Sequence, residues 1–108
     1  MLNEFVHMEK KASFKELING DKPVLVDFYA TWCGPCKAMG PVLKELTEEV
    51  GEKAHIIKVD IDKNRAAAEN FGIMGVPTFM IFKDGKMQWR QSGMLPKSAL
   101  VNVIDQYA

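Results

Sequence analysis

Two cysteines with only two residues between them are the part of this sequence best suited to chemistry. Cys33 and Cys36 are the only cysteines among 108 residues, and they enclose Gly34 and Pro35. A disulfide that closes so short a loop adds little stability to a fold. We therefore expect the pair to be made and broken during function, as a dithiol that cycles with a disulfide.

The position of the pair favours reactivity. A helix is predicted to begin near Cys33, and the unpaired N–H groups at a helix start stabilise the thiolate that attacks disulfides. Pro35 fits the first turn of this helix, where its missing N–H costs no hydrogen bond. Cys36 lies one turn deeper, on the apolar side. We expect Cys33 to be the exposed nucleophile and Cys36 the shielded resolving thiol.

Two other interpretations of the cysteine pair are open at this point. A C-x-x-C pair also begins many zinc sites, but the second ligand pair is missing, and His7 and His55 lie on opposite sides of the motif. The cysteines could also be inert core residues. Cys36 would suit that interpretation, whereas Cys33, which follows Trp32 at a helix start, would not.

Composition excludes several classes of function. Hydrophobic residues make up 47% and charged residues 26% of the chain, as in ordinary globular domains. Fourteen Lys and Arg balance 14 Asp and Glu, whereas phosphate backbones attract a basic excess. The apolar runs are far shorter than the roughly 20 residues that span a bilayer, and the first residues lack the apolar core of a signal peptide. We expect one domain, residues 1–108, in the cytoplasm.

The first half of the chain predicts a strand–helix–strand unit with parallel strands. Val24–Tyr29 and Ile56–Ile61 are near-continuous apolar runs, which are typical of strands covered on both faces. A short strand at Phe5–Met8 and a helix from Ser13 to Gly20, with capping-box spacing at its start, are predicted before this unit. The helix between the two strands, which Gly51 ends, has a stripe of apolar residues at helical spacing: Cys36, Met39, Leu43, Leu46 and Val50.

The second half predicts a short helix and a hairpin. Asp62 can cap the short, alanine-rich helix, and Gly72 can close it. Thr78–Phe82 and Met87–Gln91 are predicted strands, joined by a tight turn at Asp84-Gly85.

The last helix completes the predicted architecture. Pro96 suits its first turn, and Leu100, Val103, Ile104 and Tyr107 form its apolar stripe. The expected fold class is α/β, a central mixed sheet with helices on both faces. Such sheets bind ligands at the carboxyl ends of their parallel strands, where Cys33 lies.

Asp27 is unusual because it interrupts the apolar strand that leads to the cysteines. Strand alternation places it on one face with Leu25 and Tyr29. Burial would raise the pKa of its carboxyl unless a partner compensates. From the residues alone, a structural aspartate bonded to backbone or water is the simpler interpretation. Lys58, in the next predicted strand, could simply extend its ammonium to solvent.

Several motifs together resemble the thioredoxin family. "WCGPCK" at residues 32–37 is similar to the active-site signature of that family, and "VLVDFYA" before it and "GVPT" after it occur in the family's order and at similar spacing. The resemblance extends from about Ser13 to the C-terminus. It implies a thioredoxin fold with about five strands and about four helices. It also implies a small oxidoreductase that reduces disulfides in other proteins.

The resemblance also assigns roles to individual residues. It implies that Asp27 lies beneath Cys36 and accepts its proton, and that Lys58 neighbours Asp27. It implies a cis bond before Pro77 that faces the cysteines, with Val76 offering backbone hydrogen bonds to a bound peptide.

An apolar rim around Cys33 is expected to bind the substrate. The expected substrate-binding residues are Trp32, Gly34, Pro35, Gly75, Val76, Pro77, Gly93 and Met94. Met74 and Met94 depart from the side chains that the family leads us to expect, and both could equally be incidental loop residues.

The source of electrons is expected to be a separate protein. No G-x-G-x-x-G fingerprint occurs, so we expect the chain to bind no nicotinamide or flavin cofactor itself. The family implies an NADPH-dependent flavoprotein reductase as partner, and we expect a monomer that binds neither nucleic acid, membrane nor metal.

Two alternatives remain to the reductase interpretation. One is an oxidant or disulfide isomerase, although such relatives often carry histidine between the cysteines, where this chain has Gly34-Pro35. The other is a binding module that docks a partner on the rim without redox turnover.

Overall fold

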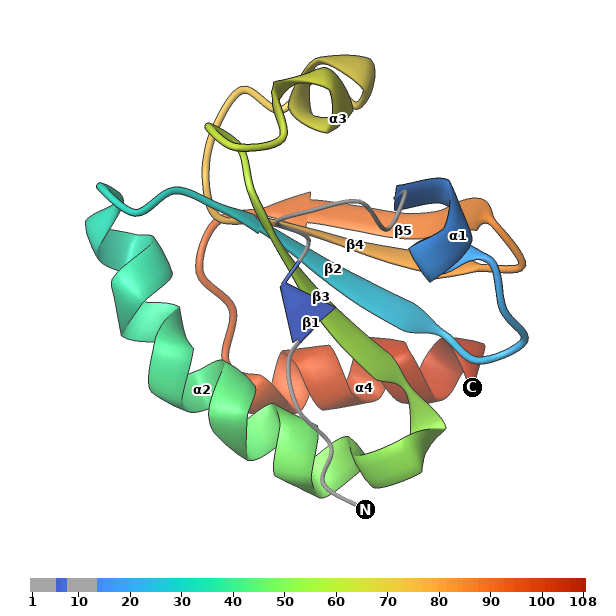
Figure 1. The fold of residues 1–108 in the computed structure, drawn as a ribbon. Coiled ribbons are helices and arrows are strands. Elements are labelled where there is room, and N and C mark those ends of the chain that lie inside the picture. The colour runs from blue at the N-terminus through green and yellow to red at the C-terminus, as the bar shows by residue number, and fades with distance from the viewer. Residues whose placement is uncertain (1–5, 8–13) are drawn as a thin grey trace.

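A five-stranded mixed sheet forms the centre of the described chain, which comprises residues 6–7 and 14–108 of a computed structural model (Figure 1). The strand order is β1-β3-β2-β4-β5. The strands are β1 (Val6–His7), β2 (Val24–Tyr29), β3 (His55–Asp60), β4 (Thr78–Lys83) and β5 (Lys86–Ser92). The helices are α1 (Phe14–Ile18), α2 (Gly34–Val50), α3 (Arg65–Asn70) and α4 (Lys97–Tyr107), and a 3₁₀ turn at Gly51–Lys53 follows α2.

Strand β2 organises the sheet from its middle. It pairs in parallel with β3, which is also parallel to β1, and it pairs antiparallel with β4. The parallel β2–α2–β3 unit that the sequence predicts is therefore confirmed. All residues of β2 except its last are buried, as expected of a strand covered on both faces.

Helices cover both faces of this sheet, as predicted. Figure 1 shows α2 and α4 on one side and α1 and α3 on the other. Each side has its own apolar core. The core under α2 and α4 comprises Leu25, Met39, Leu43, Leu46, Val50, Ala54, Ile56, Phe79, Ile81, Leu100, Val103 and Ile104. The core on the opposite face comprises Ile18, Val24, Val26, Phe28, Ile57, Val59, Met80 and Phe82.

Helix α2 begins and ends at the residues that its sequence favours. Cys33 is its N-cap residue, and Pro35 stands in its first turn. Gly51 ends it with a φ of 56°, a left-handed conformation that costs glycine little. Its predicted apolar stripe is confirmed, because every residue of that stripe is buried. None of the helices in the described part of the chain has the length and apolar character needed to cross a bilayer.

Helix α1 has five residues, too few for a stable isolated helix. Its position depends on packing: the ring centroid of Phe14 lies 6.2, 5.3 and 5.4 Å from those of Phe28, Phe71 and Phe82. Such aromatic contacts hold the helix against the sheet and α3. The predicted capping residue Ser13 lies outside the described residues, as do both ends of the strand predicted at Phe5–Met8.

The prediction that Asp62 caps the short helix is wrong. Helix α3 begins three residues later, at Arg65, with Asn64 as its N-cap residue. The reason lies in the preceding turn, where the carboxylate of Asp60 accepts hydrogen bonds from the N–H groups of Asp62 (2.8 Å) and Lys63 (3.3 Å). Because of this turn, the helix begins later in the chain, and the side chain of Asp62 is available for another contact.

Other differences between prediction and structure are small. Strand β3 begins and ends one residue earlier than predicted, β4 ends one residue later, and β5 is longer by one residue at each end. Pro96 is the N-cap residue of α4 rather than a residue of its first turn. The predicted tight turn between β4 and β5 is confirmed by the positive φ angles of Asp84 (54°) and Gly85 (77°).

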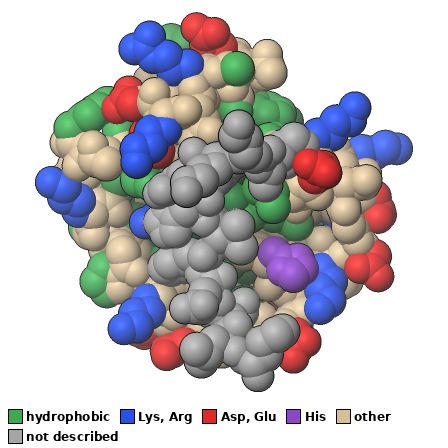
Figure 2. Space-filling view, viewed as in Figure 1, with side chains coloured by type: hydrophobic (Ala, Val, Ile, Leu, Met, Phe, Trp, Pro, Cys, Tyr) green, Lys and Arg blue, Asp and Glu red, His purple; other side chains and the backbone are tan. Residues whose placement is uncertain are grey.

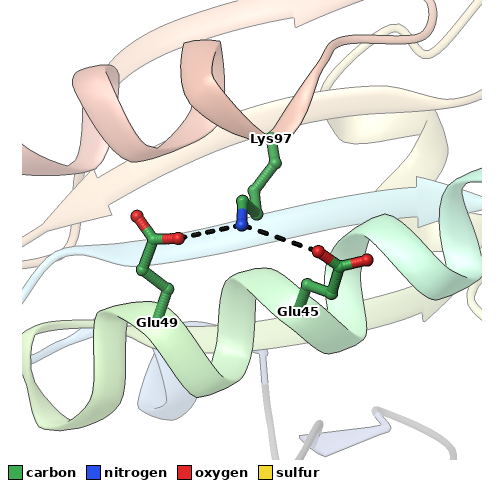
Figure 3. Close-up of polar contacts among 3 residues, drawn as sticks. All are labelled: Glu45, Glu49 and Lys97. Carbon is green, nitrogen blue, oxygen red and sulfur yellow. Dashed lines mark ion pairs between the residues drawn. The ribbon is translucent and has the colours of Figure 1, made fainter.

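A charged cluster joins the start of α4 to the second half of α2 (Figure 3). The Nζ of Lys97 lies 3.0 Å from a carboxylate oxygen of Glu49 and 3.5 Å from one of Glu45. The hydrogen bond to Glu49 is the main cause that raises the pKa of Lys97. These groups are partly or largely exposed, so the cluster adds little to the stability of the fold. Charges of both signs are interspersed over the face in Figure 2, in keeping with the balanced composition.

Leu43→Ala tests the packing of α2. Leu43 is fully buried, so its truncation should leave a cavity and lower the free energy of unfolding by about 2–5 kcal/mol. Urea denaturation of the disulfide form, followed by circular dichroism, measures the change. Lys44→Ala, at the exposed neighbouring position, is the matched control and should change stability by less than about 0.5 kcal/mol. Equal stabilities of the two variants would contradict the assigned core.

Candidate redox site

The two cysteines form a disulfide at the start of α2. Cys33 and Cys36 are bonded to each other, with their Cα atoms 5.2 Å apart. No group of three His, Cys, Asp or Glu side chains placed to hold a metal occurs among the described residues. Ala30 is buried with the two cysteines, and Tyr29, Ile61 and Val76 pack around the three. The disulfide therefore lies in a small apolar cluster of its own.

The expected contrast in exposure between the cysteines is not found in this disulfide form. Cys33 is 5% exposed and Cys36 is 6% exposed, so the prediction of an exposed Cys33 is wrong here. The sulfur of Cys33 is bonded to that of Cys36 and lies 3.6 Å from the Val76 carbonyl oxygen. A difference in access remains, because Cys33 lines the surface groove described below and Cys36 does not.

The sulfur of Cys33 lies where a helix favours negative charge. The N–H of Cys36 donates a hydrogen bond to this sulfur at 3.1 Å, so the cysteine caps the helix with its own side chain. Helix α2 has 17 residues, and the aligned peptide dipoles leave partial positive charge at its first turn. Opening the disulfide at Cys33 would place a thiolate against these donors, which lowers the pKa of such a thiol.

The loop before β4 meets the disulfide from the opposite side. The Val76–Pro77 bond is cis, as the sequence resemblance implies, and Pro77 is buried. The hydroxyl of Thr78 donates to the Gly75 carbonyl at 2.6 Å, and the N–H of Gly93 donates to the Pro77 carbonyl at 2.8 Å. These bonds fix the loop on both sides of the cis bond.

An open groove of about 390 Å³ lies between this loop and the start of α2. Within the described part of the chain, no charged side chain lines it. The lining residues are Trp32, Cys33, Gly34, Pro35, Ile61, Ile73, Met74, Gly75 and Val76.

The groove brings together most of the predicted substrate-binding residues. Three of them, Pro77, Gly93 and Met94, do not line it. Two lining residues, Ile61 and Ile73, were missed by sequence reasoning. Ile61 could have been found, because it directly follows the carboxyl end of β3, at the sheet edge where Cys33 lies. Ile73 carries no comparable signal, since it is one apolar residue in a loop.

Asp62 is a further site residue that the sequence did not reveal. The indole N–H of Trp32 donates to its carboxylate at 2.9 Å. Trp32 is 66% exposed, so this bond gives direction to an aromatic side chain that packing alone would leave free. The turn made by Asp60 holds Asp62 in place for this contact.

Asp27 is a buried carboxyl group in the middle of the sheet. It is 1% exposed, and its Oδ1 has no hydrogen-bond partner among the described residues. Burial is the main cause that raises its pKa from 3.8 to about 7, and the charge of Lys58 partly opposes that rise. Lys58 on β3 is the register partner of Asp27 on β2. The Nζ of Lys58 lies 4.6 Å from the centroid of the Tyr29 ring.

Comparison with known proteins identifies the family. A family model described as Thioredoxin matches residues 5–106. The chain is 40% identical over 106 residues to a thioredoxin of Haemophilus influenzae, a match that covers 98% of this chain and 99% of that protein. The chain belongs to the thioredoxin family. It is also 47% identical over 95 residues to a rice protein named Thioredoxin Y, chloroplastic; the match covers 87% of this chain but only 56% of the rice protein, so the chain spans about half of that relative.

Solved structures agree with this assignment. A mutant thioredoxin from Halobacterium salinarum superposes with a TM-score of 0.86 at 34% identity, over 98% of this chain and 92% of that one. A thioredoxin of Malassezia sympodialis gives a TM-score of 0.87 at 38% identity, over 97% and 91% of the two chains. The predicted thioredoxin fold is therefore confirmed. With its Cys33–Cys36 pair, the chain is a thiol–disulfide oxidoreductase.

Asp27→Asn should stabilise the disulfide form at pH 8 and have little effect at pH 4. With a folded pKa of about 7 against 3.8, the carboxyl takes up a proton on folding between these pH values, and below pH 3.8 its burial has no ionisation cost. The cost grows as the pH rises from 3.8 towards 7, to on the order of 4 kcal/mol. Asparagine does not ionise, so its burial has no cost that depends on pH.

Urea denaturation of both proteins at pH 4 and pH 8 measures this effect. Asp84→Asn makes the same substitution at an exposed turn residue and is the matched control. A stability difference between wild type and Asp27→Asn that is the same at both pH values would contradict a raised pKa.

Proposed function

We propose that the chain reduces disulfide bonds in other proteins, with Cys33 as nucleophile and Cys36 as resolving thiol. The observation that carries these roles is the difference in access to the groove: Cys33 lines it and caps α2, whereas Cys36 does not line it. A substrate disulfide in the groove can therefore meet only the sulfur of Cys33.

Reduction proceeds in two exchanges. The thiolate of Cys33 attacks one substrate sulfur, the substrate disulfide breaks, and the other substrate sulfur leaves as a thiolate that takes up a proton. Cys36 then loses its proton and attacks the sulfur of Cys33, which breaks the mixed disulfide and releases the second substrate thiol. Two electrons pass from the dithiol to the substrate, and the protein ends with its Cys33–Cys36 disulfide.

Asp27 serves as the proton acceptor for Cys36. By strand alternation it lies on the face of β2 that carries Leu25, and Leu25 belongs to the core beneath α2. A pKa of about 7 lets this carboxyl take up and release a proton near neutral pH. Lys58 has a supporting role, because its charge keeps that pKa from rising further.

The groove binds an extended segment of the substrate. Trp32, Gly34 and Pro35 form one wall, and Gly75 and Val76 form the other. The backbone of Val76 pairs with the substrate as an added strand, and Pro77 fixes the direction of that backbone. Gly93 acts through its bond to Pro77, and Met94, 53% exposed, contacts substrate beyond the groove.

Membership of the family supports a proposal for the domain organisation, oligomeric state, localisation and electron donor of the chain. Residues 1–108 form a single domain that works as a monomer in the cytoplasm and contributes to cellular redox homeostasis. A separate NADPH-dependent flavoprotein reductase returns the disulfide to the dithiol, which makes the chain a step in electron transport. The chain itself carries no cofactor.

Insulin-disulfide reduction with dithiothreitol as electron donor tests the activity. Wild type should accelerate it, and Cys33→Ser should reduce the rate to that of dithiothreitol alone, because no nucleophile remains at the groove. A wild-type rate no faster than dithiothreitol would favour a binding module instead. A redox potential close to that of strong disulfide oxidants, measured by equilibration with glutathione, would favour an oxidant or isomerase.

Cys36→Ser tests the division of labour between the cysteines. It should accumulate a covalent complex with a disulfide substrate, since the second exchange cannot occur. Because the chain has no other cysteine, any such complex must be at Cys33. Non-reducing electrophoresis and mass spectrometry detect it. Equal trapping by Cys33→Ser and Cys36→Ser would contradict the assigned roles.

Asp27→Ala tests the proton acceptor. At pH 7 it should slow the resolution of a preformed mixed disulfide by roughly 10²-fold, the usual size of a general-base contribution, and leave its formation unchanged. Stopped-flow measurement of the two steps separates them, and the slowing should lessen at higher pH, where hydroxide removes the proton. An unchanged rate of resolution at pH 7 would return Asp27 to a structural role.

A further inference from the structure

Met74 is the most exposed of the large apolar side chains among the described residues. It is 96% exposed, compared with 66% for Trp32, 53% for Met94 and 47% for Met87. Unlike Met87 and Met94, it also lines the groove that contains Cys33. A flexible thioether is thus fully open to solvent at the place where the substrate binds.

The loop that carries Met74 is tied to the sheet on both sides. The guanidinium of Arg90, on β5, donates hydrogen bonds to the carbonyls of Phe71 and Gly72, the latter at 3.1 Å. On the other side of Met74, the hydroxyl of Thr78 holds the Gly75 carbonyl. The exposure of Met74 therefore belongs to a fixed loop conformation that keeps its sulfur at the rim of the groove.

We propose that Met74 is a modification site, at which peroxide oxidises the thioether to the sulfoxide and thereby weakens the binding of protein disulfides. The proposal rests on the function proposed above, because it concerns the same groove. It adds a second oxidisable group to that groove, separate from the cysteine pair.

The oxidation of Met74 to the sulfoxide needs peroxide as its only co-reactant. The thioether sulfur attacks one peroxide oxygen, a sulfur–oxygen bond forms, and the oxygen–oxygen bond breaks. The sulfur is oxidised by two electrons, and the peroxide is reduced to water or an alcohol. In the disulfide form the sulfurs of Cys33 and Cys36 are bonded to each other and buried, so Met74 carries the open sulfur of the groove.

The sulfoxide changes binding without changing the cysteines. It replaces an apolar, adaptable side chain by a polar one in a groove that is otherwise lined by uncharged and mostly apolar residues. A protein substrate that lies against both walls loses apolar contact with the loop. A small disulfide that reaches Cys33 without touching the loop does not.

The experiment compares wild type with Met74→Leu and Met87→Leu. Leucine keeps the apolar bulk and cannot form a sulfoxide, and Met87 is the matched control, exposed on β5 but outside the groove. Each protein is treated with hydrogen peroxide in the disulfide form, freed of peroxide and reduced with dithiothreitol. Mass spectrometry of peptides measures the sulfoxide at each methionine. The kcat and KM are then measured with insulin and with a small aromatic disulfide, against an untreated sample of the same protein.

We expect peroxide to raise the KM for insulin of wild type and Met87→Leu by roughly fourfold or more, the effect of losing about one methylene group of apolar contact. The KM of Met74→Leu should rise clearly less than that of wild type, because Met94, which is also exposed and contacts substrate beyond the groove, is oxidised in both proteins. No protein should change with the small disulfide. An unchanged insulin KM in wild type whose Met74 is fully oxidised overturns the proposal, and so does an equal rise in Met74→Leu. The untreated samples test the reductase function separately, because they measure insulin reduction before any methionine is oxidised.

Discussion

The pairing of β2 with β3 on one side and with β4 on the other determines the geometry of the whole site. Because β2 and β3 are parallel, their carboxyl ends meet at one edge of the sheet. Because β4 is antiparallel to β2, its first residue arrives at the same edge. The cysteine turn follows β2, Ile61 and Asp62 follow β3, and Pro77 precedes β4. Three segments distant in sequence are thus brought to one groove by the pairing of the strands.

The same central position explains why Asp27 is both costly and useful. A carboxyl on β2 has strands on both sides and helices over both faces, so water cannot solvate its charge. The fold is less stable at neutral pH for this reason, which an asparagine would avoid. At the same time, a group that would be fully ionised at the surface titrates near neutral pH, within the range needed to move a thiol proton. Stability and the proposed proton transfer therefore make opposite demands on this residue.

The sequence predicted the strands, helices and turns whose formation depends mainly on residues close to one another in the chain. The apolar run of β2, the stripe and ends of α2 and the Asp-Gly turn each depend on residues within a few positions of one another. Asp62 was misassigned because a capping signal is only local, whereas its real partner, Trp32, lies 30 residues away. The burial of Cys33 could not be predicted either, since it involves Ile61 and Val76, which are distant in sequence. The cis bond before Pro77 was expected from the family pattern and not from proline alone.

The proposed substrate groove suits recognition by shape and backbone more than by charge. None of the described residues that line it is charged, and the nearby carboxylate of Asp62 is engaged by the indole of Trp32. The backbone of Val76 can pair with any extended segment, whatever its side chains. If substrates bind as proposed, such a surface would discriminate weakly among sequences and strongly between accessible and buried disulfides, because the substrate would have to present an extended strand to the sulfur of Cys33. Side-chain preference is then left to the few flexible apolar groups at the rim, of which Met74 is the most exposed.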